Sequence, residues 1–137
     1  MKPDPGTYAL ILQSNSNETI QVGRWGQVNL QPGYYIYIGS AFGPGGVQAR
    51  VSRHLRNDKQ MHWHIDYLRD HVTPVEVWVS YAADHLEHEW ATVLFEMTEM
   101  TQILGFGCSD CKRYSHLFFT RGLPNINQLG KVERMLV

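Results

Sequence analysis

Five residues of this 137-residue chain have side chains that could act together on a phosphate ester: Tyr8, Tyr37, Arg50, His54 and Glu87. Arginine suits such a reaction because its planar guanidinium can hold two phosphate oxygens at once. Histidine exchanges a proton near neutral pH, and a carboxylate can bind a hard divalent cation. Residues of these types could carry out metal-assisted hydrolysis if the fold brings them together.

Arg50 and His54 are expected to share one face of a helix over residues 47–56, because residues four apart on a helix are neighbours. The apolar residues of that helix recur every four positions and form a separate stripe: Val47, Val51 and Leu55. Two interpretations of the polar face remain open, namely a solvated surface or a surface that looks across a sheet at a phosphate. The helix follows Gly-Pro-Gly-Gly at residues 43–46, a loop that leads into the helix N-terminus and could touch a phosphate of a DNA backbone.

Glu87 is the carboxylate expected to point inward from a helix over residues 86–97, with Asp84 as its N-cap. It lies at the edge of the apolar face of that helix, whereas Glu89 lies on the polar side. A carboxylate at a buried edge needs a partner. A divalent cation would be one partner, and a capping box with Asp84 would be another, because the two residues have the required spacing.

Structural zinc sites use four ligands, and the sequence supplies three close together: Cys108, Cys111 and His116. We favour a pair of reduced cysteines that shapes a tight loop over residues 105–111, in preference to zinc. His62 and His64 also resemble metal ligands, but residues two apart on a helix face different ways. We therefore expect these histidines to surround a buried Trp63 instead.

The composition is that of a folded domain with a core, because 43% of the residues are hydrophobic. We expect one domain over residues 1–137, with a core over residues 6–120 and a C-terminal tail over residues 121–137. The formal net charge is −1, whereas nucleic-acid binders are often strongly basic. Any basic surface must therefore be local, and the densest basic stretch lies at residues 50–59.

Targeting signals are not expected in this chain. No apolar run approaches the roughly 20 residues that span a bilayer, and the N-terminal residues lack the apolar segment of a signal peptide. Two cysteines do not make a disulfide scaffold in a chain of this length. These features predict a protein of the reducing cytoplasm with no membrane partner.

The hydrophobic pattern predicts strands over residues 7–12, 19–22, 27–30, 34–40, 75–81 and 115–120, and helices over residues 47–56, 62–71 and 86–97. The second and third strands are joined by a short turn and form a hairpin near the N-terminus. The predicted fold class is α/β in the layered α+β sense: a small, mainly antiparallel central sheet flanked by helices, with an extra N-terminal hairpin.

The two tyrosines lie in short motifs, Gly6-Thr7-Tyr8 and Tyr37-Ile38-Gly39, and the helix with Arg50 and His54 follows them. Longer strings accompany the motifs: Gly-Tyr-Tyr-Ile-Tyr-Ile-Gly-Ser at 33–40, His-Trp-His-Ile-Asp-Tyr-Leu at 62–68 and Gly-Phe-Gly-Cys-Ser-Asp-Cys at 105–111. This ordered set resembles the GIY-YIG endonuclease superfamily, and in particular a branch of small proteins that carries similar strings.

The resemblance implies hydrolysis of one phosphodiester bond, in DNA more than in RNA, with one Mg²⁺ or Mn²⁺ ion. Tyr8 and Tyr37 would match the two family tyrosines, of which one helps to activate water. Arg50 would match the arginine that stabilises charge on the phosphate, and His54 would occupy a position where the family carries His or Tyr. Glu87 would match the glutamate that binds the metal.

A second group of residues is expected to contact the nucleic acid: Gly39, Ser40, Arg53, His64 and His116. The chain departs from the family pattern because more residues separate Tyr8 from Tyr37, and because no asparagine follows the glutamate helix closely. His116 could take the place of that asparagine. Two alternatives therefore stand beside a nuclease: a non-catalytic nucleic-acid-binding module of the same fold, and a zinc-stabilised interaction domain built around the two cysteines.

Overall fold

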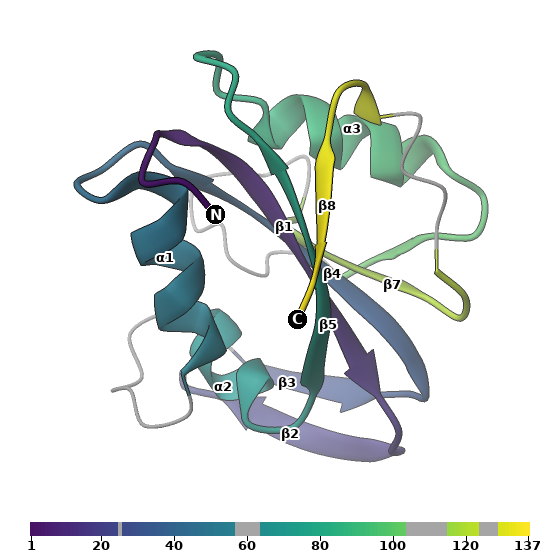
Figure 1. Cartoon of the computed structure of the whole chain (residues 1–137). Coiled ribbons are helices and arrows are strands. Elements are labelled where there is room, and N and C mark those ends of the chain that lie inside the picture. Colours follow the sequence, from purple (N-terminus) through teal and green to yellow (C-terminus); the bar gives the residue numbers. More distant parts are fainter. Residues whose placement is uncertain (25, 57–63, 104–114, 124–128) are drawn as a thin grey trace.

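An antiparallel sheet forms the centre of the structure, which a computed structural model describes for residues 1–24, 26–56, 64–103, 115–123 and 129–137 (Figure 1). Its strands, in spatial order, are β6 (Thr101–Gln102), β7 (Leu117–Thr120), β4 (Gly33–Ala41), β1 (Gly6–Ser14), β5 (Thr73–Ser80) and β8 (Glu133–Leu136). The helices beside it are α1 (Gly46–Leu55), α2 (His64–Arg69) and α3 (Glu87–Glu96). The predicted fold class, a mainly antiparallel sheet flanked by helices, is confirmed.

β1 is a central strand of the sheet, and it is covered on both faces, as its apolar sequence predicts. It pairs antiparallel with β4 on one side and with β5 on the other. Because side chains alternate across a strand, Tyr8 and Leu10 belong to the core on one face, whereas Ala9 and Ile11 belong to the core on the other. The domain therefore has two hydrophobic clusters, one on each side of the same sheet.

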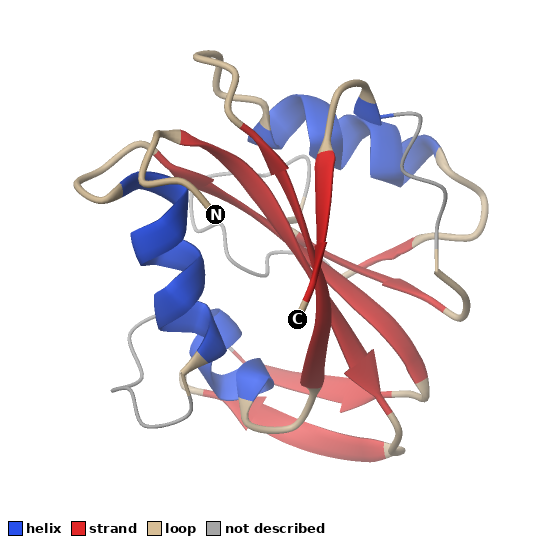
Figure 2. Cartoon of the chain, in the orientation of Figure 1, coloured by secondary structure: helices blue, strands red, loops and turns tan. Residues whose placement is uncertain are grey.

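The helices cover different faces of the sheet (Figure 2). α1 and α2 pack on the face that carries Tyr8, whereas α3 packs on the opposite face. β2 (Glu18–Val22) and β3 (Gly26–Leu30) form the predicted N-terminal hairpin as a separate two-stranded sheet, which packs against α2. In the part of the chain that the structure describes, no helix is long and apolar enough to cross a membrane.

The C-terminal tail adds an edge strand that the hydrophobic pattern did not indicate. β8 pairs antiparallel with β5, and Arg134 of β8 forms an ion pair with Glu76 of β5, whose side chain is buried. The indole N–H of Trp78 also donates to the Glu76 carboxylate at 3.4 Å. A buried carboxylate needs such partners, so the sheet extends beyond the expected core boundary at residue 120.

The first residues of the chain cap α1. The backbone N–H of Val47 donates to the carbonyl of Asp4 at 2.9 Å, and that of Gln48 donates to the carbonyl of Lys2 at 3.1 Å. These bonds satisfy donors that the N-terminus of a helix otherwise leaves free. Because both amides already have a carbonyl partner, a contact between a DNA phosphate and the loop at residues 43–46, which stays a prediction, would have to use other groups.

α3 begins at Glu87, and its N-cap is Leu86 and not the predicted Asp84, which is exposed. Leu86 has no side-chain group that could cap the helix, but its backbone N–H donates to Thr7 Oγ1 on β1 at 3.2 Å. The capping-box interpretation of Glu87 required Asp84 as the N-cap and is wrong. The start of α3 is instead anchored to the central strand, which sets the position of Glu87.

We predict that Gly46→Ala destabilises the fold, because Gly46 adopts a left-handed φ of 59°. A Cβ at this position would collide with the carbonyl oxygens of Pro3 and Asp4. Backbone strain of this kind costs about 1–3 kcal/mol, which urea denaturation would measure as a lower free energy of unfolding. Gly43→Ala is the matched control, because a Cβ there meets nothing within 4 Å. Equal stability of the two variants would contradict the prediction.

Candidate active site

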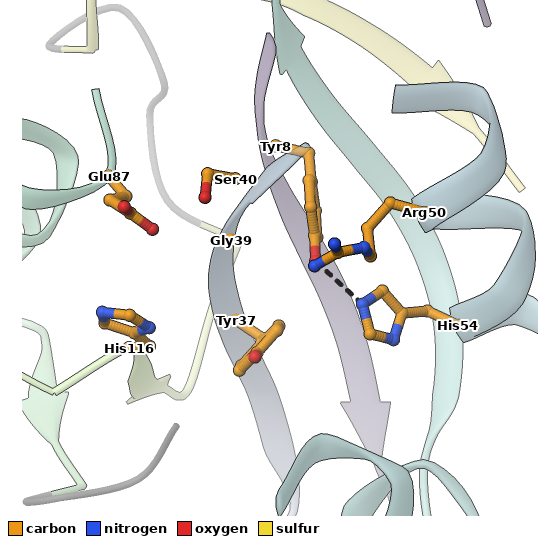
Figure 3. Close-up of a pocket in the computed structure, with 8 residues that line it drawn as sticks. All are labelled: Tyr8, Tyr37, Gly39, Ser40, Arg50, His54, Glu87 and His116. Carbon is orange, nitrogen blue, oxygen red and sulfur yellow. Dashed lines mark hydrogen bonds between the residues drawn. The ribbon is translucent and has the colours of Figure 1, made fainter. Parts of the chain in front are cut away.

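A pocket of about 190 Å³ lies near the end of β4 (Figure 3). The described residues that line it come from separate parts of the chain: Tyr8, Tyr37, Gly39, Ser40, Arg50, His54, Glu87 and His116. All of the residues predicted to be catalytic are among them, as are Gly39, Ser40 and His116 from the predicted substrate contacts. The structure therefore places in one cavity most of the side chains that the sequence patterns single out.

The pocket lies where one side of β4 has no strand partner among the described residues. β7 pairs with β4 no further than Tyr37, and the backbone N–H of the next residue, Ile38, donates to the His116 carbonyl at 2.9 Å. Beyond this point, side chains from the two faces of the sheet can meet around its edge. α1 brings its polar face from one side, and α3 brings Glu87 from the other (Figure 3).

Gly39 makes room for the ring of Tyr8. The two residues lie opposite each other in the register of β1 and β4. A Cβ on Gly39 would overlap the hydroxyl oxygen and Cζ of the Tyr8 ring. The glycine of the Tyr-Ile-Gly motif is therefore a steric requirement, because any side chain there would displace the Tyr8 ring.

The Tyr8 hydroxyl forms a hydrogen bond of 2.8 Å with Nε2 of His54, and each of these residues is only 1% exposed (Figure 3). The Arg50 guanidinium also lies beside this hydroxyl. Because arginine can only donate hydrogen bonds, the Tyr8 oxygen accepts from Arg50, and its own O–H donates to His54 Nε2 in the tautomer that leaves this nitrogen unprotonated. At His54, the polar face of α1 is thus a buried contact with the sheet and not a solvated surface.

Both tyrosines of the pocket are neutral near pH 7. Burial raises the pKa of Tyr8 well above its usual value of 10.0; the nearby Tyr37 and Glu87 add to the rise, and Arg50 opposes it. Burial likewise raises the pKa of Tyr37, whose ring lies edge-on to His54 with the centroids 5.9 Å apart. Tyr8 can therefore accept a proton only if it gives up its hydroxyl proton at the same time. His54 Nε2 lies within hydrogen-bond distance to receive that hydroxyl proton.

Glu87 and His116 lie across the pocket from Arg50 and His54 (Figure 3). Glu87 is half-buried, whereas Glu89 is exposed, which confirms the predicted orientation of the helix. Burial lowers the pKa of His116, although the charge of Glu87 partly offsets this effect. A carboxylate and an imidazole that favours its neutral form therefore share this wall of the pocket.

A divalent cation fits the donor set of this wall. Mg²⁺ is usually held by one or two carboxylates and otherwise by waters and substrate phosphates, so the Glu87 carboxylate would be one protein ligand of such an ion. Among the described residues, no group of three or more His, Cys, Asp and Glu side chains is arranged to hold a metal. Cys108 and Cys111 lie outside the described residues, so the zinc interpretation stays a prediction.

A family model described as Domain of unknown function DUF123 matches residues 7–134. The chain belongs to this family. A comparison with curated proteins gave no match, and a comparison with solved structures gave none either. The matched range runs from β1 into β8, so the DUF123 domain contains every residue that lines the pocket.

Arg53 and His64, two of the predicted substrate contacts, are not among the described residues that line this pocket. The Arg53 guanidinium donates two hydrogen bonds, of 2.9 and 3.0 Å, to the carboxylate of Asp66, which is fully buried. This bidentate pair joins α1 to α2. His64 begins α2, where burial lowers its pKa.

Asp66 and Arg69 support the site, a role that the sequence patterns did not assign to them. The guanidinium of Arg69 donates to the carbonyls of His54 and Leu55 at 3.2 and 3.3 Å, which satisfies acceptors at the end of α1. The charge of Asp66 contributes to the raised pKa of Tyr37. The sequence does contain a signal for a buried, paired carboxylate at Asp66, because this acidic residue lies inside the mainly apolar string at 62–68.

We predict that the free energy of unfolding falls as the pH rises above about 10, and that Tyr8→Phe makes this fall shallower. An unfolded tyrosine loses its proton near pH 10, whereas burial holds the pKa of Tyr8 higher in the folded state. The native state then keeps a proton that the unfolded state has lost, which removes about 1.4 kcal/mol of stability per pH unit. Urea denaturation at several pH values would measure the two profiles. Parallel profiles would contradict the prediction.

We also predict that Gly39→Ala breaks the hydrogen bond between Tyr8 and His54, because the added Cβ displaces the Tyr8 ring. The ¹⁵N chemical shift of His54 Nε2 reports this bond. It should move in Gly39→Ala as it does in Tyr8→Phe, which lacks the hydroxyl, and should stay in place in the control Gly43→Ala. A wild-type shift in Gly39→Ala would show that the ring does not depend on this glycine.

Proposed function

We propose that this chain is a divalent-metal-dependent endonuclease of the GIY-YIG type that hydrolyses phosphodiester bonds in DNA. The observation that supports this most strongly is the arrangement of the pocket, with the bonded Tyr8–His54 pair and Arg50 on one side and Glu87 on the other. A phosphate between them would contact a proton acceptor, a guanidinium and a metal-binding carboxylate. The order of these residues in the chain is similar to that of the GIY-YIG superfamily.

The Tyr8–His54 pair would activate the attacking water. As the water loses a proton to the Tyr8 oxygen, Tyr8 releases its own proton to His54 Nε2 along the 2.8 Å hydrogen bond. No free phenolate forms in this transfer, so the raised pKa of Tyr8 is no obstacle. A positioned base of this kind contributes about 10²–10⁴-fold to the rate.

Arg50 would stabilise the charge that develops on the phosphate. A guanidinium has several N–H donors in a rigid plane, so Arg50 can donate to the Tyr8 oxygen and to a phosphate oxygen at the same time. Both contacts lower the energy of negative charge at the reacting centre, and donors fixed in advance have no reorganisation cost during the reaction.

Glu87 would hold the divalent cation, Mg²⁺ or Mn²⁺, which when bound supplies positive charge beside the leaving oxygen. Glu87 lies across the pocket from His54 (Figure 3). Water activation and support of the leaving oxygen would therefore take place on opposite sides of the phosphate. In-line displacement at phosphorus requires that arrangement.

DNA is the proposed substrate and RNA the second choice, and we propose that the protein acts in the reducing cytoplasm. The alternative is a non-catalytic nucleic-acid-binding module of the same fold. Two features of the sequence favour that alternative: the net charge of −1 and the lack of an asparagine between His88 and Thr120. The complete set of both tyrosines, Arg50 and Glu87 in one pocket favours the enzyme.

We predict that the purified protein cleaves DNA with Mg²⁺ or Mn²⁺ but not with EDTA, and that Glu87→Gln lowers the cleavage rate at least about 100-fold. The amide keeps the shape of the side chain and removes the charge that holds the cation. Glu89→Gln is the matched control, because Glu89 lies on the same helix and is exposed. Cleavage of labelled single-stranded, duplex and branched DNA would be followed by gel electrophoresis.

Binding without cleavage of any substrate would move the assignment to the non-catalytic module. Its affinity would then fall steeply with salt concentration, because phosphate contacts release counterions. Equal loss of cleavage in Glu87→Gln and Glu89→Gln would also count against the proposed site, since only Glu87 lines the pocket.

A further inference from the structure

A stacked pair of aromatic rings lies next to the pocket and has no role in the chemistry described above. The rings of Phe42 and His85 have their centroids 3.9 Å apart and are inclined by 19°. Phe42 directly follows β4, and His85 lies shortly before α3. The pair therefore joins the two elements that bring Ser40 and Glu87 to the pocket.

The pair is close enough to contact a nucleotide whose phosphate occupies the pocket. Phe42 is two residues from Ser40, and His85 is two residues from Glu87. Ser40 and Ala41 lie in β4, and two residues of extended chain span about 7 Å, which is about two nucleotide steps at the roughly 3.4 Å rise of a strand in duplex DNA. The neighbouring residues 43–45 and 82–84 are exposed, so the described chain beside the pair faces solvent.

His85 is exposed to solvent although its ring stacks on Phe42. A ligand that reaches this ring would meet the face turned away from Phe42. Phe42 is half-buried and supports the plane of the imidazole from below. Flat rings held in this way are the surfaces on which nucleobases stack in proteins that bind single strands.

We propose that Phe42 and His85 form a platform on which a nucleobase next to the cleaved bond stacks, an inference that rests on the proposed nuclease function. Both faces of a base inside a duplex are covered by its neighbours, so a base on the platform must be unpaired or turned out of the stack. The platform therefore selects DNA with unpaired nucleotides at the cleavage site. Because every base has a flat face, the selection does not depend on sequence.

The test measures the binding of a fluorescent single-stranded DNA oligonucleotide by anisotropy in EDTA, so that metal-dependent cleavage does not occur. We expect His85→Ala to raise the Kd about tenfold, because stacking on one aromatic side chain contributes roughly that factor per base. His85→Phe keeps a ring and should bind as the wild type does, which separates stacking from hydrogen bonding or charge. His71→Ala is the control, since His71 is exposed and pairs with Glu18 of β2, away from the pocket.

A single abasic site, moved along the oligonucleotide one position at a time, identifies the stacked base. At one position we expect the abasic site to weaken binding to the wild type about tenfold, and to abolish the difference between wild type and His85→Ala. If His85→Ala binds as the wild type does, or keeps its full defect at every abasic position, the platform is wrong while the nuclease proposal stands. If the wild type binds no single-stranded DNA, the platform is wrong, and the cleavage assay with Mg²⁺ or Mn²⁺ decides the nuclease proposal separately.

Discussion

The buried hydrogen bond between Tyr8 and His54 is the constraint on which the rest of the pocket depends. A phenol hydroxyl inside a core is costly unless it is paired, so Tyr8 needs a partner from another layer. His54 can reach the Tyr8 hydroxyl only when α1 packs at a particular position along β1. That position also brings Arg50 to the same hydroxyl. Gly39 leaves the space that the Tyr8 ring occupies. One polar contact therefore couples strand register, helix position and the placement of a charged side chain.

The surroundings of α1 hold that helix in the required position. Carbonyl oxygens of the first residues bind its N-terminal amides, and Arg69 binds carbonyls at its C-terminal end. The Arg53–Asp66 pair joins its last turn to α2. α3 is positioned independently on the other face, where Leu86 bonds to Thr7 of β1. The two faces of the sheet meet at the pocket because the pairing of β4 with β7 reaches no further than Tyr37.

Most of the helices and strands were predictable because their signals are local. The alternating pattern in β4 correctly separates the core on one face from the core on the other, and the apolar periodicity of α3 correctly turns Glu87 inward and Glu89 outward. Asp84 failed as an N-cap because a bond to the neighbouring strand, which no local pattern reveals, sets the start of α3. β8 was not indicated because its position depends on Arg134 reaching the buried Glu76, far away in the sequence.

The sequence by itself determined the layered antiparallel fold and the identity of the residues with useful chemistry, since residue types and periodicity are local properties. Only the tertiary structure decided which of those residues meet. Arg50 and Arg53 are chemically alike and lie on the same helix, yet one lines the pocket while the other pairs with Asp66. Their separation follows from which face of α1 packs against β1 and which against α2, and that choice depends on the burial of side chains from distant parts of the chain.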